Sequence, residues 1–306
     1  MDLPEIKYNE AGEVVVNASD SPDIMQVLEA GVNDSKIFFP TAFPDNFYKQ
    51  PSELHEAVIE TIDMIDHGVK KIVIQAPRGI GKTTTATALA GKRILMCENR
   101  FIPYVSKSHD FAAMQTENLK ADLMESEFVR NVFGNIKVGY DKSMQESWSK
   151  KSWIANVDSH QTFILPRGSG QQVRGLKWRR WRPDGCIVDD LEDTETIDNE
   201  DIRKKRKEWF FGDLLKFFET GGAPWWIVYI DTLKHEDSLM AELLELKDWE
   251  KLNLAICDDN YQTLAPDFMS QEEIDAEVQE ARDDHEVSNQ ASNQAPPDTH
   301  NRDRSS

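Results

Sequence analysis

The sequence predicts a three-layer α/β/α fold built on a mostly parallel central β-sheet. Short runs rich in β-branched and aromatic residues predict strands, and longer segments with apolar residues at helical spacing predict helices. The two kinds of segment alternate along the chain, which is typical of parallel strands joined by helices that cover both faces of the sheet. With 306 residues, 39% of them hydrophobic, the chain can bury a large core.

The first predicted elements are helices. The amino-terminal segment carries scattered proline and glycine, and only one short helix is expected in it, at residues 21–30. In residues 51–67, apolar side chains recur at helical spacing from Leu54 to Ile65, after Ser52 as a candidate cap. We therefore expect a helix directly before the first strand.

Strands and helices then follow one another. KIVIQ at residues 71–75 is a β-branched run that leads into a glycine-containing loop and a helical segment. FIPYVS at residues 101–106 predicts a second strand, and a helical pattern covers about 109–130. WIANVD (153–158) and QTFILP (161–166) predict a hairpin. The remaining predicted elements are the strand GCIVDD at 185–190, a helix at about 199–218 and the strand WWIVYI at 225–230.

Composition divides the chain into three predicted regions. Residues 1–45 form an amino-terminal arm, residues 46–265 form the α/β domain, and residues 266–306 form an acidic tail. The tail contains SNQASNQAPP and NRDRSS, which have no hydrophobic periodicity, so we expect it to be largely disordered.

The cysteines and the hydropathy of the sequence indicate the cellular compartment in which the protein is expected. The three cysteines are an odd number without CxxC spacing, which argues against a disulfide framework and a structural zinc site. No apolar run approaches the roughly 18 residues that span a bilayer, and no signal-peptide pattern opens the chain. A cytoplasmic protein without a membrane partner is expected.

Charge is segregated along the chain. The net charge of −20 would normally argue against a nucleic-acid partner. Residues 150–182, however, carry eight basic residues and one acidic residue, a local charge of +7. A basic surface within an acidic protein is therefore expected.

A phosphate-binding loop is predicted between the strand at 71–75 and the helix after it. Ala76, followed by four residues and then Gly81, Lys82 and Thr83, satisfies the P-loop pattern, with alanine in place of the leading glycine. Glycines allow backbone N–H groups to face phosphate, the lysine reaches the β and γ oxygens, and the hydroxyl binds Mg²⁺. A plain glycine turn is the alternative, but the flanking strand and helix favour the nucleotide loop. The predicted nucleotide-binding residues are Ala76, Pro77, Arg78, Gly79, Ile80, Gly81, Lys82, Thr83 and Thr84.

A second acidic motif completes the predicted ATP and Mg²⁺ site. Asp189 ends an apolar strand, where its carboxylate can hold Mg²⁺ together with Thr83, and Asp190 beside it can polarise the attacking water. For Glu192 alone, capping of a following helix is the favoured interpretation. The 107 residues between Lys82 and Asp189 leave room for further strands and helices, as in additional-strand ATPases.

Taken together, these motifs resemble the ATPase domain of the large terminase subunit of tailed bacteriophages, the motor that packages DNA into the prohead. The resemblance covers about residues 43–249 and rests on four segments: PRGIGKTT, PYVSKSHDFAAMQTENLKADL, QQVRGLKWRRWRPDGCIVDDLED and IDTLKHEDSL. It implies an additional-strand P-loop ATPase that couples ATP hydrolysis to translocation of double-stranded DNA. It also implies a homo-oligomeric ring, a portal protein and a small terminase subunit as partners, and a location in the host cytoplasm.

The resemblance also implies roles for particular residues. Arg78 matches an arginine that contacts the γ-phosphate as an internal finger. Arg174 matches an arginine offered to a neighbouring subunit's ATP, with a contact to DNA phosphate as an equally weighted alternative. Asp231 and Thr232 match the motif that couples loss of the γ-phosphate to the rest of the domain. Many relatives have glutamate where Asp190 stands, so Glu192 remains a rival general base.

Weaker expectations concern base recognition and DNA. Tyr48 or Gln50, just before the first helix of the domain, stand where the family contacts adenine, although an aromatic residue there is more often part of the core. Trp178 and Trp181 lie among arginines and could stack on nucleic acid, although Trp in a core or interface is commoner.

The sequence departs from the family after His235. The family continues into a nuclease whose clustered carboxylates bind two metal ions, but here no predicted strand that ends in paired carboxylates follows. Nuclease activity is therefore not predicted for this chain. Two alternatives stay open: another DNA-remodelling or helicase-like ATPase, and a nucleotide-binding remnant without turnover.

Overall fold

The computed structural model describes residues 31–32, 34–137, 148–218, 222–266 and 268–279. The chain divides into two compact units, Met1–Leu254 and Ala255–Ser306. Within the described residues, the helices of the first unit that have defined bounds are α2 (Ser35–Ala42), α3 (Glu53–Asp63), α4 (Lys82–Leu95), α5 (His109–Glu125), α6 (Glu127–Phe133), α7 (Glu200–Trp209), the π-helical turn η2 (Phe210–Leu214) and α8 (Leu239–Glu245). Its strands are β1 (Lys71–Gln75), β2 (Phe101–Ser106), β3 (Trp148–Ser149), β4 (Ser152–Val157), β5 (His160–Gly168), β6 (Gly185–Asp189), β7 (Trp226–Asp231) and β8 (Glu250–Asn253).

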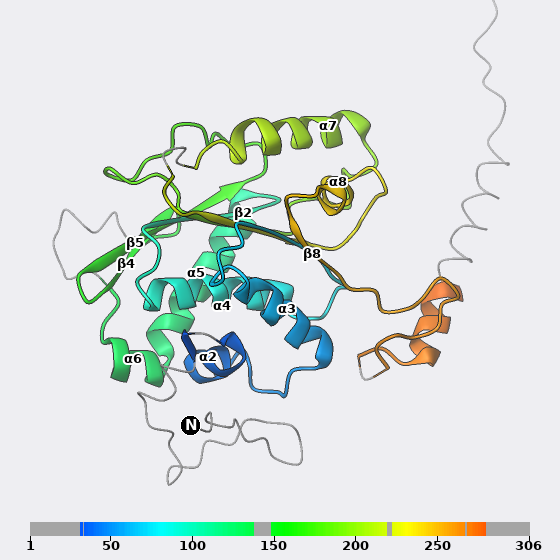
Figure 1. The fold of residues 1–306 in the computed structure, drawn as a ribbon, viewed down its shortest axis with the longest axis horizontal. Coiled ribbons are helices and arrows are strands. Elements are labelled where there is room, and N and C mark those ends of the chain that lie inside the picture. Colours follow the sequence, from blue (N-terminus) through cyan, green and yellow to red (C-terminus); the bar gives the residue numbers. More distant parts are fainter. Residues whose placement is uncertain (1–30, 33, 138–147, 219–221, 267, 280–306) are drawn as a thin grey trace, which may run out of the picture. The chain divides into compact units, whose positions relative to one another are not determined.

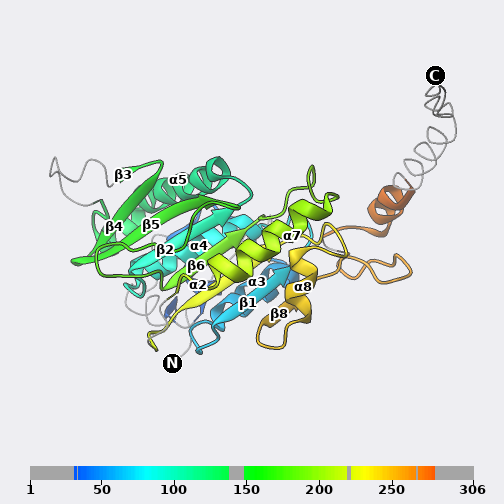
Figure 2. The ribbon, with the colours of Figure 1, turned by 90° about the horizontal axis from the view of Figure 1, so that it is seen from above.

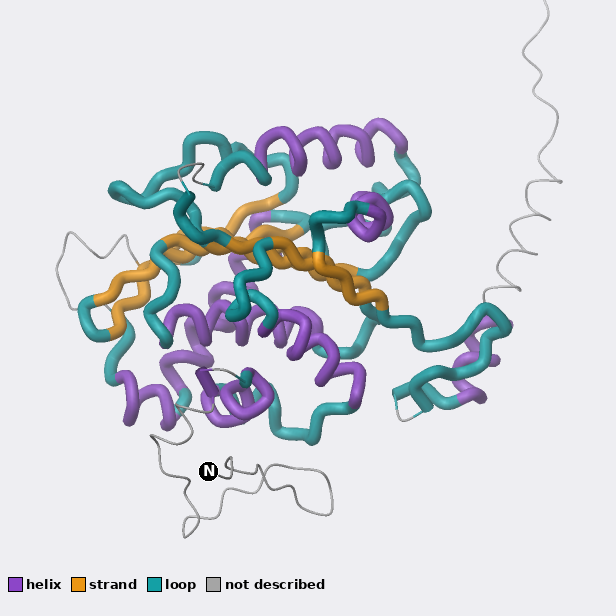
Figure 3. The backbone as a smooth tube through the Cα atoms, viewed as in Figure 1, coloured by secondary structure: helices purple, strands orange, loops and turns teal. Residues whose placement is uncertain are grey.

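The first unit is built on one mixed sheet of eight strands in the order β3-β4-β5-β2-β6-β7-β1-β8. From β5 to β8 all neighbours are parallel, and β4 is antiparallel to both β3 and β5. The prediction of an α/β fold with a mostly parallel sheet is therefore confirmed. Figure 3 shows the strands as a continuous band between helices.

Helices cover both faces of this sheet. Figure 1 shows α7 and α8 on one face and α3, α4 and α5 on the other. Every residue of β2 and of β7 is buried. Burial on both faces explains why these strands are nearly continuous apolar runs rather than alternating ones. The core under α7 and α8 includes Phe210, Phe217, Tyr229 and Leu239.

The strand predictions agree closely with the structure. The runs KIVIQ and FIPYVS coincide with β1 and β2. The predicted hairpin is formed by β4 and β5, whose turn places Asp158 and Ser159 at positive φ (43° and 67°). Tight two-residue hairpin turns need such a conformation because it matches the twist of the strands.

Two long predicted helices end earlier than expected. The helix expected over 109–130 is interrupted at Ser126, whose hydroxyl accepts a hydrogen bond from Val129 N–H (3.2 Å) and so caps a new helix, α6. The helix expected over 199–218 begins after its cap Asn199 as predicted, but passes into η2 at Phe210. Side-chain caps and wide turns are local features that hydrophobic periodicity does not report.

Some elements were not predicted. The expected arm, residues 1–45, contains α2, while the helix expected at 21–30 lies outside the described residues. The short elements α8 and β8 follow β7. In the second unit, residues 271–279 of the expected tail are helical, and residues 280–306 lie outside the described residues. The proposed domain boundaries remain predictions.

The strand order fixes where functional groups can meet. β7 lies between β6 and β1, with Asp189 paired to Ile230 and Gln75 paired to Asp231. The labelled strands follow the sheet order in Figure 2. The carboxyl ends of β1, β2, β6 and β7 therefore share one edge of the sheet, where open α/β sheets usually bind ligands. Among the described residues, none of the helices has the length and apolar character needed to cross a bilayer.

Candidate functional site: a phosphate loop facing three aspartates

The loop between β1 and α4 has the backbone that the sequence predicts for a phosphate cradle. Gly79 and Gly81 have φ angles of 88° and 65°, a region that costs glycine little and other residues more. Gly81 is also the N-cap of α4. Lys82 and Thr83 consequently occupy the first turn of that helix, where free N–H groups and the helix dipole favour an anion.

Lys82 is held at the mouth of this loop. Its Nζ donates to the carbonyl oxygen of Ala76 (2.8 Å) and to Oγ1 of Thr232 (2.9 Å), and it also contacts the carbonyl oxygen of Pro77. Burial lowers the pKa of Lys82, although the nearby carboxylates of Asp231 and Asp189 act in the opposite direction. The lysine thus links the phosphate loop to the end of β7.

Asp189 lies beside the loop at the end of β6 and is 3% exposed. Its carboxylate accepts a hydrogen bond from the Tyr104 hydroxyl (2.9 Å). Burial raises the pKa of Asp189 to about 6, and hydrogen bonds from the hydroxyls of Tyr104 and Thr83 partly oppose that rise. The hydroxyl of Thr83 and the carboxylate of Asp189 therefore lie together, as a shared Mg²⁺ ion would require.

Asp190 turns away from the strand and faces two lysines. Its φ of 48° is unusual for a residue other than glycine, and backbone strain of this kind is frequent at functional sites. Its carboxylate contacts Nζ of Lys234 (2.7 Å) and of Lys107 (3.8 Å). Burial acts to raise the pKa of Asp190, but hydrogen bonding and the charge of Lys234 outweigh it and hold the pKa below its usual value.

Asp231 and Thr232 join β7 to both motifs. Asp231 is fully buried and accepts hydrogen bonds from the backbone N–H groups of Thr232 (2.7 Å) and Glu192 (3.2 Å). The Thr232 hydroxyl donates to the carbonyl oxygen of Ala76 (3.1 Å). Burial raises the pKa of Asp231 to about 7, and the charge of the adjacent Lys234 opposes it. A movement of the backbone at the end of β7 would therefore change the contacts of the phosphate loop and of the segment that follows β6.

These groups line one cavity of about 500 Å³. Nine of the predicted site residues line it: Arg78, Gly79, Gly81, Lys82, Thr83, Asp189, Asp190, Glu192 and Thr232. Ala76, Pro77 and Ile80 of the loop and Thr84 in the first turn of α4 do not line the cavity, and neither does the fully buried Asp231.

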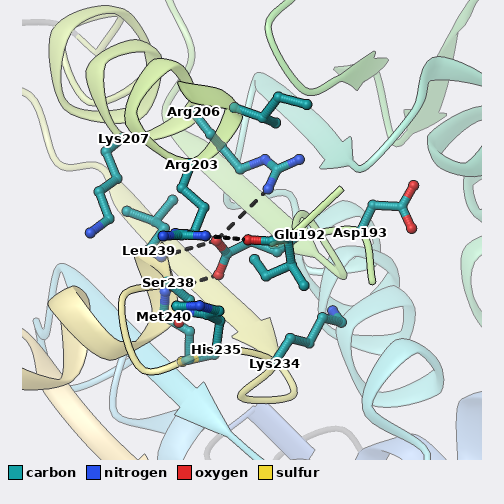
Figure 4. Close-up of polar contacts among 12 residues, drawn as sticks. Glu192, Asp193, Arg203, Arg206, Lys207, Lys234, His235, Ser238, Leu239 and Met240 are labelled. Carbon is teal, nitrogen blue, oxygen red and sulfur yellow. Dashed lines mark hydrogen bonds and ion pairs between the residues drawn. The ribbon is translucent and has the colours of Figure 1, made fainter. Parts of the chain in front are cut away.

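Glu192 lines the cavity, but its carboxylate is engaged elsewhere. The two carboxylate oxygens accept hydrogen bonds from the backbone N–H groups of Leu239 (3.0 Å) and Met240 (3.1 Å), at the start of α8. Arg206 of α7 lies 3.9 Å away, and the Glu192 side chain is 1% exposed. Figure 4 shows Glu192 directed at Arg206 and the start of α8, with Asp193 pointing away. The expected capping role is therefore present, but for α8 rather than for α7.

The two predicted arginines have different surroundings. Arg78 is exposed at the cavity and forms no ion pair or hydrogen bond within the described part of the chain. Arg174 does not line the cavity: it pairs with Asp213 and donates to the carbonyl oxygen of Gly212 (3.1 Å). Its side chain is 70% exposed. Only Arg78 is placed to reach a ligand of this cavity within one chain.

The residues considered for base recognition lie apart from the cavity lining. Tyr48 is 51% exposed, and neither it nor Gln50 lines the cavity. Trp178 stacks on Phe163, with ring centroids 5.5 Å apart. The guanidinium of Arg179 lies 4.7 Å from the centroid of the same Trp178 ring.

Sequence reasoning missed two lysines and a tyrosine. Lys234 bridges Asp190 and Asp231 and is 6% exposed, Lys107 lies over the Phe111 ring (4.2 Å), and Tyr104 binds Asp189. The carboxylates of Asp231 and Asp190 outweigh burial and raise the pKa of Lys234. Position within a strand or shortly after one was the available signal, since Tyr104 belongs to β2, Lys107 follows β2 and Lys234 follows β7.

Comparisons with known proteins find likeness only at the level of structure. Neither the protein-family models nor the curated proteins provide a match. Among solved structures, the chain is similar to the large terminase ATPase domain of Thermus phage P74-26, with a TM-score of 0.42 and 12% identity over 72% of this chain and 85% of that chain. It is also similar to a DEAD box protein from the hyperthermophile Methanococcus jannaschii (TM-score 0.43, 12% identity, 70% of this chain and 53% of that chain). A third similar structure is the Phi-28 gp11 DNA packaging motor (TM-score 0.38, 13% identity, 66% and 61%).

Proposed function

We propose that this chain is an additional-strand P-loop ATPase with a three-layer α/β/α fold. It hydrolyses ATP with Mg²⁺ and moves double-stranded DNA as the motor subunit of a viral DNA-packaging terminase. The observation that carries the proposal is the position of Thr83 and Asp189, which line the same cavity at the mouth of the glycine loop, with the Thr83 hydroxyl close enough to Asp189 to act on its pKa. The position of β7 between the loop strand β1 and the acidic strand β6 supports the additional-strand class.

The phosphate loop would bind the triphosphate, with its N–H groups and Lys82 facing the β and γ oxygens. The hydroxyl of Thr83 and the carboxylate of Asp189 are hard oxygen donors of the kind that Mg²⁺ prefers. Bound there, Mg²⁺ would supply charge neutralisation for the phosphates. Tyr104 keeps the buried Asp189 carboxylate oriented toward the loop by its hydrogen bond of 2.9 Å.

Asp190 is the proposed general base for the attacking water. Lys234 and Lys107 favour its ionised form, and only an ionised carboxylate can accept a proton. Glu192, the rival base, already accepts two backbone hydrogen bonds at the start of α8. The balance between the two acids therefore favours Asp190.

The remaining predicted residues are assigned to charge stabilisation and coupling. Arg78 is exposed at the cavity and would stabilise charge that develops on the γ-phosphate. Arg174 would act outside its own cavity, on a neighbouring subunit's ATP or on DNA phosphate. Thr232 contacts both Lys82 and Ala76, so it would transmit loss of the γ-phosphate to β7 and Asp231.

The terminase assignment brings proposed partners and a location with it. These are duplex DNA, further copies of the chain in a ring, a portal protein and a small terminase subunit, in the host cytoplasm and transiently at the prohead. They rest on the sequence motifs shared with the terminase family.

A steady-state ATP hydrolysis assay with and without duplex DNA tests the proposal. We expect Mg²⁺-dependent turnover that duplex DNA stimulates. Lys82→Ala should lower turnover by at least about 10²-fold, because the cation that faces the transferred phosphoryl group is lost. Lys151→Ala, at an exposed turn, is the matched control and should keep wild-type turnover.

Each contrary result has a distinct meaning. Wild-type turnover in a folded Lys82→Ala protein would remove the phosphate-loop assignment. Turnover that ignores duplex DNA would remove the motor role and favour another ATPase. Tight ATP binding without turnover would favour the remnant that no longer hydrolyses nucleotide.

A further inference from the structure

A short hairpin in which Trp178 and Trp181 flank two arginines stands at the opposite edge of the sheet from the phosphate loop. Trp178 and Trp181 form reciprocal backbone hydrogen bonds of 2.9 Å, which close a turn with Arg179 and Arg180 at its tip. Arg179 has a φ of 54°, and both arginines are exposed. The backbone of this turn therefore presents two adjacent cations to solvent.

Aromatic rings hold these cations in place. The Arg179 guanidinium lies 4.7 Å from the centroid of the Trp178 ring, and that of Arg180 lies 4.6 Å from the Trp181 ring. A third guanidinium, from Arg100, lies 5.4 Å from the same Trp181 ring. Cation–π contacts orient a guanidinium plane while leaving its N–H groups free. We call Trp178, Arg179, Arg180 and Trp181, together with Arg100, the arginine–tryptophan hairpin.

None of its three arginines forms an ion pair within the described residues, although the chain carries a net charge of −20. Asp184, close in sequence, instead accepts hydrogen bonds from the backbone N–H groups of Arg100 (2.8 Å) and Phe101 (3.0 Å). Surface arginines in so acidic a chain could readily find carboxylates. Their uncompensated charge marks this surface as a site for an anion from outside the chain.

The arginines surround a hollow of about 400 Å³, to which Ser159 and Gln161 also contribute. Arg100 directly precedes β2, whereas Ser106 at the other end of β2 lines the nucleotide cavity. Six strand residues span roughly 20 Å. The hollow and the nucleotide cavity are therefore separate sites at opposite ends of one buried strand.

We infer that the arginine–tryptophan hairpin binds backbone phosphates of duplex DNA. Guanidinium groups match phosphate by paired hydrogen bonds, and the neutral side chains of Ser159 and Gln161 are further phosphate and sugar donors. The inference rests on the hairpin itself and not on the proposed ATP site.

The geometry distinguishes phosphate contact from base stacking. Phe163 stacks on Trp178, Arg179 covers the same ring, and Trp181 is covered by Arg100 and Arg180. Each tryptophan ring thus already has two partners within the chain, which leaves less of its surface for the unstacked bases that single-strand binding proteins stack on aromatic rings. An intact duplex, read through its phosphates, is consequently the expected ligand.

Fluorescence anisotropy with a labelled 20-base-pair duplex and the full chain, over a series of salt concentrations, tests the inference. The variant combines Arg179→Asn, since asparagine tolerates positive φ, with Arg180→Gln. Loss of two phosphate contacts should lower the salt slope by about 1.8 and weaken binding by up to roughly 60-fold at 0.1 M salt. Arg100→Gln should weaken binding in the same direction without altering the turn.

The matched control combines Lys150→Gln with Lys151→Gln, which removes the same charge from the exposed β3–β4 turn and should keep duplex binding within about twofold. Duplex binding is measured without nucleotide, so failure of the ATP site would not imitate failure of the hairpin. Unchanged binding in the folded hairpin variants, or equal loss in the lysine control, would overturn the inference. The inference would also be overturned if the hairpin variants lost binding only to polyglutamate or only to single-stranded DNA and still bound the duplex as the wild type does.

Discussion

Positively charged side chains have different surroundings at the two edges of the central sheet, the carboxyl edge where the parallel strands end and the amino edge where they begin. At the carboxyl edge, Lys234 contacts both Asp190 and Asp231 and is 6% exposed. At the amino edge, the arginines of the arginine–tryptophan hairpin lie over tryptophan rings and have no carboxylate partner in the part of the chain that the structure describes. Buried charges that satisfy one another hold structure, whereas exposed charges left uncompensated are available to a ligand.

Arg78 is the exception at the carboxyl edge, since it is exposed at the cavity and unpaired within the described residues. Because its charge is exposed and uncompensated, Arg78 is expected to bind a ligand, as the arginines of the hairpin are. Removing a cation should therefore cost stability at Lys234 and cost binding at Arg78 or at the hairpin.

The largest stability effect is expected for Lys234→Met. Without this lysine, the fully buried Asp231 loses its ion-pair partner, and Asp190 keeps only Lys107, whose Nζ lies 3.8 Å away. Breaking one partner of a buried ion pair typically costs about 3 to 5 kcal/mol. Urea unfolding at pH 7 measures the loss, and Lys177→Met, an exposed lysine beside the hairpin, should change the free energy of unfolding by less than about 0.5 kcal/mol. Equal changes in the free energy of unfolding in the two variants would contradict the proposed difference between the two edges.

Glu192→Gln should have the next largest effect. A glutamine side chain has one acceptor oxygen, so it can accept well from only one of the two backbone N–H groups of Leu239 and Met240. The buried Arg206 also loses its counter-charge. We expect a loss of about 2 kcal/mol of unfolding free energy. ATP turnover per folded molecule should stay close to wild type, whereas a general base in this position would lose most of it. Turnover measured at a temperature where the variant is folded separates the two outcomes.

A smaller, pH-dependent effect is expected at Asp63, in a third compensated cluster. Asp63 accepts hydrogen bonds from Ser35 and lies 3.4 Å from Nζ of the buried Lys92. Burial raises the pKa of Asp63, and the charge of Lys92 opposes it without reversing it. Because the folded-state pKa is raised, the folded protein binds this proton more tightly, and the resulting stability is present at low pH and lost as pH rises through the folded pKa.

The measurement for Asp63 is the unfolding free energy of wild type relative to Asp63→Asn between pH 4 and pH 7. The difference should grow in favour of wild type as the pH is lowered. A difference that shrinks on acidification would mean that Lys92, rather than burial, dominates the environment of Asp63.

Much of this arrangement could be predicted from sequence, because local signals determine it. The run FIPYVS is buried along its whole length, so its apolar character alone predicted β2. Residue types at fixed spacing matched the phosphate-loop pattern, and the structure places the glycines of that pattern at positive φ, directly after a strand.

Other features depend on contacts between distant segments, which spacing does not report. Glu192 caps α8, whose first residues lie 47 positions away, and not the helix that follows it. Lys234 reaches Asp190 only because β7 lies beside β6 in the sheet. The tryptophans of the hairpin could be seen to lie among arginines, but only the structure shows that Phe163 stacks on Trp178 and that the Arg180 guanidinium lies over Trp181.

Calorimetric titration with a non-hydrolysable ATP analogue, with Mg²⁺ and with EDTA, tests the shared metal site of Thr83 and Asp189 most directly. We expect Mg²⁺ to tighten binding by about tenfold or more in the wild type, since the ion bridges phosphate and protein oxygens. Thr83→Ala and Asp189→Asn should each lose that gain while keeping wild-type affinity in EDTA. Retention of the full Mg²⁺-dependent gain in both folded variants would contradict the proposed site.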